Sequence, residues 1–107
     1  MNFVYEKATI KDELEPKVGM GCTSLLFSDR HAHTITRVSK SGKTFWCQQD
    51  IAKRIDNNGM SELQEYEYNQ DLLAPEKMVR LCKRAQWRCK GTRFLIGYRR
   101  EYYDYSF

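Results

Sequence analysis

The sequence has no long hydrophobic run, because no uninterrupted stretch of apolar residues is longer than three, as at residues 25–27. A helix needs about 20 apolar residues to cross a bilayer, so we expect no membrane partner. The first ten residues also lack the basic, apolar and small-residue segments of a secretory signal. We therefore expect the protein to reside in the cytoplasm.

Cysteine is present, but never in the paired spacing of a metal site. The gaps between Cys22, Cys47, Cys82 and Cys89 are 25, 35 and 7 residues, and the chain has no CxxC motif. Structural zinc sites usually need such pairs, and a disulfide framework is rare in a reducing compartment. We predict buried, reduced cysteines that pack as small hydrophobic residues, with no metal and no cofactor.

Histidine is scarce as well, and its two copies, His31 and His33, stand close together. On a strand they would share one face, which permits chelation, but Asp29 is the one further ligand nearby. We favour an ordinary surface hairpin over a metal site or an acid–base pair. Pairing of Cys22 or Cys47 with a histidine has no supporting motif either, so we expect no catalytic residues and no enzymatic activity.

The chain of 107 residues has room for one hydrophobic core, so we expect a single domain, residues 1–107. Hydrophobic residues make up 41% of the chain, which is enough for a small core. Residues 1–16 are predicted to form an appendage with a short helix, because Thr9 is a good N-cap and Pro16 ends a helix. Residues 17–107 are then the β-barrel core.

The chain after residue 17 is typical of short strands, because β-branched and aromatic residues recur between turn residues. The expected strands are 18–27, 31–39, 44–49, 65–68, 78–83, 87–90 and 94–100. One helical turn is expected at 51–54. Tyr66 and Tyr68 should face inward while Glu65 and Glu67 face outward. This spacing predicts a mainly β fold, a small antiparallel barrel or sandwich.

The formal net charge of +4 is unevenly distributed along the chain. Residues 1–76 contain 9 basic and 12 acidic side chains, net −3, whereas residues 77–107 contain 9 basic and 2 acidic ones, net +7. No acidic residue occurs between Lys77 and Arg100. A field of one sign attracts partners of the opposite charge, so this segment predicts an anionic partner.

The basic segment, residues 77–100, is rich in arginine, whose planar fork suits phosphates, and it contains aromatic residues that stack on bases. The candidate binding residues are Arg80, Arg84, Trp87, Arg88, Arg93, Tyr98, Arg99 and Arg100. Strand parity would place Arg80 and Arg84 on one face, with Val79 and Leu81 pointing inward.

A structural role is the alternative to a binding role for both the basic segment and the C-terminal residues. The basic side chains could form a solvated face that pairs with Glu65 and Glu67. Residues 98–107 hold five of the 14 aromatic residues, and we favour a last strand that closes the barrel with alternate tyrosines on the core. The other interpretation is an exposed aromatic contact surface, because tyrosine and arginine are enriched at interfaces.

Several short strings resemble a family of small uncharacterised proteins encoded by phages and prophages of Gram-positive bacteria. They are VGMGCT (18–23), SDRHA (28–32), TI (34–35), VS (38–39), SGK (41–43), DNNGMSE (56–62) and GYRREYYD (97–104). The order of the first three strands, with a glycine-rich entry, a polar turn and a Ser-Gly turn, is also similar to SH3-like barrels, which serve as nucleic-acid and protein adaptors. The resemblance implies a phage-encoded protein that acts in the cytoplasm of a host cell.

These observations predict a non-enzymatic binding module that engages nucleic acid or a nucleoprotein through its basic C-terminal surface. One alternative is an anti-defence inhibitor of the anti-CRISPR type, which binds and blocks a host protein that handles nucleic acid. Such an inhibitor could use an acidic surface as a phosphate mimic, and the candidates are Glu62, Glu65, Glu67 and Asp71. Another alternative is a component of virion assembly.

Overall fold

The computed structural model describes residues 15–105 of the chain. The short helix predicted from Thr9 onward begins outside the described residues. The elements are β1 (Gly21–Leu25), β2 (Arg30–Val38), β3 (Thr44–Gln49), β4 (Ile51–Arg54), β5 (Tyr66–Asn69), β6 (Glu76–Cys82), the 3-10 turn η1 (Lys83–Ala85), β7 (Gln86–Cys89) and β8 (Thr92–Ile96). Between residues 15 and 105 there is no helix long and apolar enough to span a membrane.

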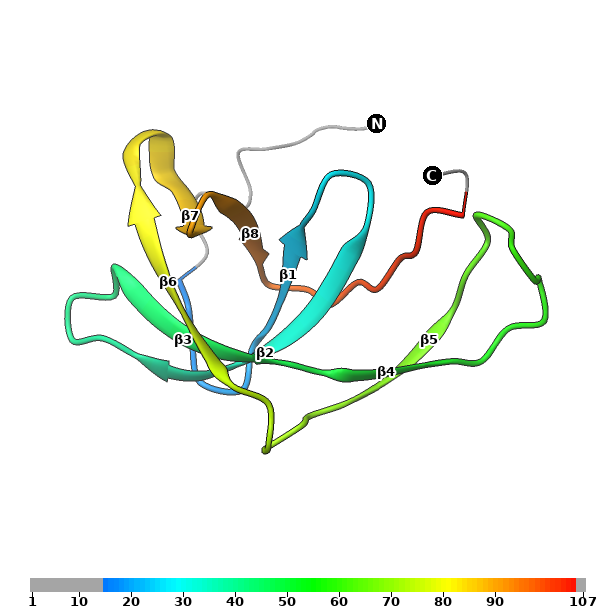
Figure 1. The fold of residues 1–107 in the computed structure, drawn as a ribbon. Coiled ribbons are helices and arrows are strands. Elements are labelled where there is room, and N and C mark those ends of the chain that lie inside the picture. The colour runs from blue at the N-terminus through cyan, green and yellow to red at the C-terminus, as the bar shows by residue number, and fades with distance from the viewer. Residues whose placement is uncertain (1–14, 106–107) are drawn as a thin grey trace.

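Six strands close into an antiparallel barrel in the order β1-β2-β3-β6-β7-β8, and β8 returns to pair with β1 (Figure 1). The prediction of a mainly β fold with a small antiparallel barrel is confirmed. Strands β4 and β5 pair with each other and leave the barrel as a hairpin, which we call the arm, residues 51–69. Since Asp50 alone separates β3 from β4, the arm continues β3 out of the barrel.

Alternate residues of the barrel strands point inward and form one core. The buried residues of this core are Cys22, Ile35, Phe45, Cys47, Val79, Trp87, Phe94 and Ile96. The ring centroids of Phe45 and Trp87 lie 5.0 Å apart, a contact that packs β3 against β7. Because the inner positions are filled in this way, the alternate positions of the same strands are left on the outer surface.

The cysteines follow their prediction only in part. All four are free, with Cys22 and Cys47 buried, Cys89 half-buried and Cys82 exposed. Contact with Cys47, together with burial, raises the pKa of the Cys22 thiol well above its usual range, so this thiol stays protonated. The prediction of burial is wrong for Cys82, because β6 ends there and its last residues lie outside the core.

The helical turn predicted at residues 51–54 is wrong, because this segment is strand β4. It pairs in antiparallel register with β5, a partner well downstream that the local sequence pattern does not reveal. The alternation predicted for the partner strand is confirmed, since Tyr66 and Tyr68 are half-buried while Glu65 and Glu67 are exposed. Tertiary pairing therefore decides the conformation of β4 over its local preference.

The C-terminal segment, residues 97–105, does not form the closing strand predicted for it. Strand β8 pairs with β1 and closes the barrel, and it ends where Gly97 adopts a left-handed φ of 103°. We call residues 97–105 the tail. Two of its tyrosines are well exposed, Tyr98 at 45% and Tyr103 at 53%, so the tail presents aromatic side chains at the surface.

The tail joins the arm to the barrel, and it can be followed in Figure 1 in orange and red. On the barrel side it forms a bridge between Arg30 and Tyr102. On the arm side, Nε2 of Gln64 donates to the carbonyl oxygen of Tyr103 over 2.7 Å. The Glu101 backbone N–H also donates to the hydroxyl of Tyr68 in β5 over 2.8 Å. These contacts fix the position of the arm relative to the barrel.

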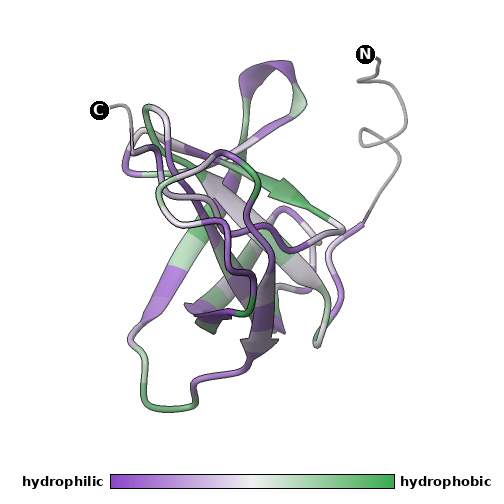
Figure 2. Cartoon of the chain, turned by 90° about the vertical axis from the view of Figure 1, so that its right-hand side faces the viewer, coloured by the Kyte–Doolittle hydropathy of each residue, from purple (hydrophilic) through white to green (hydrophobic). Residues whose placement is uncertain are grey.

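The loop between β5 and β6 is the lowest point of Figure 2, where it is coloured green. It carries Leu72 and Leu73, which are 75% and 95% exposed. Nε2 of Gln48 donates to the carbonyl oxygens of Leu72 and Ala74 over 3.1 and 2.8 Å. The backbone of this loop is therefore anchored to the barrel while its leucine side chains meet solvent.

Candidate functional site

Three arginines face one another across three neighbouring strands of the barrel. Arg80 of β6 pairs in register with Arg88 of β7, which pairs in register with Arg93 of β8. Directly opposed residues share one face of a sheet, and neighbouring strands lie about 4.8 Å apart. Trp87 and Phe94, the chain neighbours of Arg88 and Arg93, are buried in the core, so the arginines lie on the outer surface. We call Arg80, Arg88 and Arg93 the arginine row.

The arginine row is costly for the fold itself, since like charges directly opposite one another destabilise a sheet. None of its members forms an ion pair with a carboxylate of residues 15–105. Arg88 donates instead to the carbonyl oxygen of Gly91 over 3.0 Å and to Oε1 of Gln86 over 2.7 Å. These neutral acceptors orient the guanidinium group and leave its positive charge available to an anion.

A groove of about 360 Å³ lies beside the row, and its lining residues are Ser28, Arg30, Tyr98, Arg100 and Tyr102. Burial raises the pKa of Tyr98 above its usual value, while the charges of Arg30, Arg100 and Arg93 act in the opposite direction. Arg93 pairs in register with Leu25 of β1, which pairs with Arg30 of β2, so the arginine row adjoins this groove, which we call the tyrosine groove. An aromatic ring among arginines is suited to an anion that carries aromatic bases.

Trp87 and Arg84 do not lie on this surface. Trp87 is 8% exposed and belongs to the core, so we leave it out of the proposed surface. Arg84 lies in the turn η1 with a φ of 66°, so the prediction that it shares a strand face with Arg80 is wrong. Leu81, predicted to point inward, is 37% exposed because β6 leaves the core as it ends at Cys82. The turn itself was expected near residues 85–86, between the strands at 78–83 and 87–90, but it begins earlier, at Lys83, and so includes Arg84.

Arg99 is part of the fold rather than of the basic surface. Its Nε donates to Oδ2 of Asp50 and its Nη2 to Oγ1 of Thr34, each over 3.0 Å. Thr34 in turn donates to Oδ1 of Asp50 over 2.6 Å. The Asp50 side chain is 1% exposed, so this ion pair ties the tail to the end of β3. We leave Arg99 out of the proposed surface and keep Arg100, which lines the tyrosine groove.

Within residues 15–105, no ion pair joins the basic segment to Glu65 or Glu67, the pairing expected if the segment had only a structural role. Both glutamates are exposed on the arm, where Glu67 pairs in register with Lys53 of β4. Among residues 15–105, the contact of Arg99 with Asp50 is the one ion pair between residues 77–100 and the earlier chain. Most of the positive charge of the basic segment therefore remains uncompensated within the described chain.

The acidic candidates lie on the arm and in the loop after it, away from the arginine row (Figure 1). Glu62, Glu65 and Glu67 are exposed, whereas Asp71 is half-buried and accepts a hydrogen bond from the Leu73 backbone. The exposed apolar side chains of the arm include Ile55 at 55%, Met60 at 75% and Leu63 at 72%. The arm thus presents acidic and apolar side chains together.

The two histidines lie on the same face of β2 but differ in environment. Nδ1 of His31 lies 2.7 Å from Oε2 of Glu101, and this contact raises the pKa of His31. His33 is fully buried against Phe94, with ring centroids 5.1 Å apart, so the prediction of an ordinary surface hairpin is wrong for it. The part of the chain that the structure describes contains no group of three metal-binding side chains. The absence of a metal stays a prediction.

Acid is expected to destabilise the protein through His33. Burial, together with the charge of Lys77, lowers the pKa of His33 from 6.5 to about 4. Between these pH values the unfolded chain binds more protons than the folded one, so the free energy of unfolding falls as the pH falls, by about 3 kcal/mol in all. The raised pKa of His31 changes the free energy of unfolding only above pH 6.5. Urea unfolding at a series of pH values measures this loss.

A variant without the titrating group separates His33 from the carboxylates. His33→Phe keeps a ring in the core, so its stability is expected to change much less between pH 6.5 and 4. The pKa values of Asp56 and Glu76 are lowered from 3.8 and 4.5, so these carboxylates reduce the stability only below those pH values. They do so equally in wild type and in His33→Phe. An equal loss of stability in His33→Phe would assign the acid sensitivity to other groups.

Comparison with known proteins leaves the function to be argued from geometry. No family model, no curated protein and no solved structure matches the chain. The resemblance to phage-encoded proteins and the similarity to SH3-like barrels therefore stay predictions.

Proposed function

We propose that the protein binds nucleic acid through the arginine row and the tyrosine groove. The observation that carries the proposal is the row itself, in which Arg80, Arg88 and Arg93 stand directly opposite one another without an ion pair in residues 15–105. A polyanion would offset the repulsion that the fold alone leaves within the row. Arginine forks also match the geometry of phosphate oxygens.

Tyr98 is the residue that we propose to contact bases. Its side chain is 45% exposed, and it lines the tyrosine groove together with Arg30 and Arg100. Stacking of a base on an aromatic side chain tolerates every base, and phosphate contacts carry no sequence information. The proposed mode of binding is therefore one of low sequence preference, in which phosphates bind the arginines and one unpaired base stacks on Tyr98.

Replacing Tyr98 with alanine is expected to weaken the binding of a single-stranded oligonucleotide by about 5- to 150-fold, the equivalent of about 1–3 kcal/mol of stacking. Duplex binding should change little, because paired bases stack on each other. Fluorescence anisotropy with labelled oligonucleotides at about 50 mM salt measures both affinities.

Tyr103→Ala is the matched control for this test. Tyr103 is 53% exposed on the same tail, but its ring packs against Tyr105, with centroids 4.7 Å apart, and it does not line the tyrosine groove. Equal losses in Tyr98→Ala and Tyr103→Ala would argue against stacking in the groove. If wild-type protein bound no oligonucleotide at low salt, the proposed function itself would fail.

The arm supports a second candidate function, that of an inhibitor that binds a nucleic-acid-handling protein. The supporting observation is that the arm exposes Glu62, Glu65 and Glu67 together with Met60 and Leu63. Carboxylates can stand in for phosphates, and an exposed group of apolar side chains is typical of a protein interface. Neither candidate function includes a catalytic step, and the expectation of no enzymatic activity stays a prediction.

Nuclease treatment separates the two candidate functions. An inhibitor should retain one host protein in a pull-down after all nucleic acid is digested, and Glu65→Lys/Glu67→Lys should release it. Retention that disappears with the nuclease favours direct binding of nucleic acid instead.

A further inference from the structure

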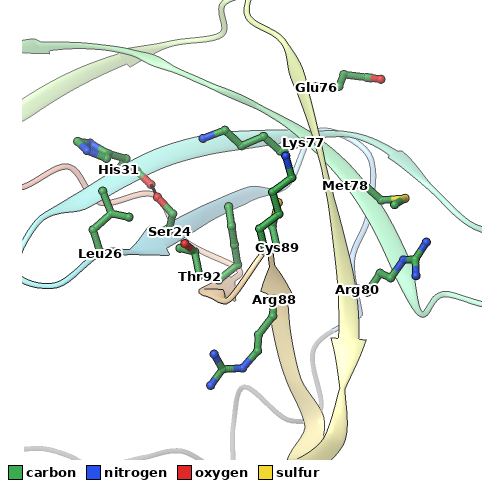
Figure 3. A pocket seen from close by; sticks show the side chains of 12 residues that line it. Ser24, Leu26, His31, Glu76, Lys77, Met78, Arg80, Arg88, Cys89 and Thr92 are labelled. Carbon is green, nitrogen blue, oxygen red and sulfur yellow. Dashed lines mark hydrogen bonds between the residues drawn. The ribbon is translucent and has the colours of Figure 1, made fainter.

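A pocket of about 560 Å³ opens where β6 separates from β7 (Figure 3). Strand β6 pairs with β7 only from Arg80 to Cys82, so its first half, Glu76 to Val79, has no partner on that side. The residues of β1, β2, β7 and β8 that face this gap form the other walls. The volume is within the range of small-molecule sites, and we call this hollow the side pocket.

Lys77 extends into the side pocket from the inner face of β6. It shares the inner face of β6 with the buried Val79, and Figure 3 shows it extending toward β2, where His31 lies. Its charge adds to burial in lowering the pKa of His33, which agrees with this position. Figure 3 shows Arg80 on the opposite side of β6. Arg80 and Arg88 of the arginine row reach the rim of the side pocket as well, so the two sites adjoin, whereas Arg93 is not among the residues that line the pocket.

The rest of the lining combines further cations with hydroxyl groups and apolar surface. The lining residues that matter here are Arg88, Lys90, Ser24, Thr92, Leu26 and Phe94. Glu76 is the one carboxylate among the lining residues, and it is already engaged. Its Oε2 accepts from Thr36 over 2.6 Å and its Oε1 from Arg37 over 3.1 Å. The side pocket is therefore positively charged, with hydrogen-bond donors and one apolar wall.

The chemistry of this lining narrows the class of ligand. Several cations around one hollow, with little compensating acid, favour a compact and strongly charged anion such as a phosphate monoester. The apolar surface of Leu26 and Phe94 favours a ligand that also has a flat, uncharged body. A nucleotide combines both parts in one molecule.

We infer that the side pocket binds the phosphate monoester of a nucleotide, with Lys77 and Lys90 at the phosphate and Leu26 beside the base. The nucleotide is either free or the 5′-phosphorylated end of a strand, and only the second source rests on the proposed binding of nucleic acid by the arginine row. The side pocket binds a single terminal phosphate, whereas the arginine row contacts phosphates along a strand.

Isothermal titration with adenosine 5′-monophosphate tests the inference, with adenosine as the probe that lacks the phosphate. The monophosphate should bind at least tenfold more tightly than adenosine. Lys77→Met and Lys90→Met should each lower the affinity for the monophosphate at least tenfold. Lys43→Met, an exposed lysine outside the side pocket, should not change it. Thermal unfolding of each variant verifies that it is folded, and Lys90, which is exposed, provides a change that leaves the core intact.

Oligonucleotides with a 5′-phosphate or a 5′-hydroxyl distinguish the two sources. Tenfold tighter binding of the phosphorylated strand, abolished in Lys77→Met, assigns the side pocket to strand ends. Equal binding of the two strands, with the monophosphate bound, assigns it to the free nucleotide. The inference is overturned if the monophosphate binds no better than adenosine, or binds Lys77→Met as well as wild type. Weaker strand binding in Arg93→Gln, the member of the row outside the side pocket, with retained monophosphate binding tests the arginine row separately.

Discussion

Replacing Arg99 with methionine is expected to lower the free energy of unfolding by about 3–5 kcal/mol, because it leaves the Asp50 carboxylate buried without its cation. Asp50 is 1% exposed, and Nε of Arg99 lies 3.0 Å from its Oδ2. Thr34 remains as a neutral donor to the other oxygen, but a hydroxyl group does not balance the charge. Urea unfolding followed by circular dichroism measures the loss.

A second substitution tests whether the unpaired charge of Asp50 causes this loss of stability. In Arg99→Met/Asp50→Asn the charge is gone and Thr34 can still donate to the amide oxygen, so the double variant should be more stable than Arg99→Met alone. Gly21→Ala should disturb the same ion pair through Arg99, because a Cβ at position 21 would lie 2.6 Å from Cγ of Arg99. A loss below about 1 kcal/mol for Arg99→Met would show instead that Asp50 is not dependent on this partner.

Replacing all three members of the arginine row with glutamine is expected to weaken duplex DNA binding about 500-fold at 0.1 M salt. Each phosphate contact adds about 0.9 to the slope of log K against log salt, so each is worth about eightfold at that concentration. Arg80, Arg88 and Arg93 stand side by side on three strands and can contact successive phosphates. Removing three like charges that oppose one another should also leave the fold at least as stable as before.

The matched control removes the same formal charge elsewhere. In Lys17→Gln/Lys40→Gln/Lys53→Gln the lysines before β1, of the β2–β3 hairpin and of the arm are replaced, and all three are exposed. This variant should keep affinity within a few fold of wild type, because none of its lysines belongs to the row or lines the tyrosine groove. Equal losses in both triple variants would mean that only net charge matters, and the row would have no specific role.

Several strands of the barrel and of the arm could be predicted because their sequences carry local signals. Alternation of Tyr66 and Tyr68 with glutamates and the Ser-Gly turn at residues 41–42 mark a strand and a hairpin without any knowledge of the fold. Strand β4 carries no such signal, and its conformation depends on β5. The closing strand was misplaced for the same reason, since nothing local shows that β8 pairs with β1.

The candidate site could be predicted in its charge but not in its arrangement. The absence of acid between Lys77 and Arg100 marked the segment, yet the pairing register alone shows which arginines stand opposite one another. In the sequence Arg99 and Arg100 are equivalent neighbours. Only the structure shows that Arg99 pairs with the buried Asp50, whereas Arg100 lines the tyrosine groove. The side pocket depends on where β6 parts from β7, which no sequence pattern records.

The salt dependence of duplex binding by wild type and by Arg80→Gln/Arg88→Gln/Arg93→Gln tests the proposed role of the arginine row most directly. If the row contacts three phosphates, the slope of log K against log salt should be smaller in magnitude by about 2.7 in the variant, while both proteins show the same thermal unfolding. An unchanged slope, whatever the affinities, would show that these arginines do not contact the backbone and would contradict the account.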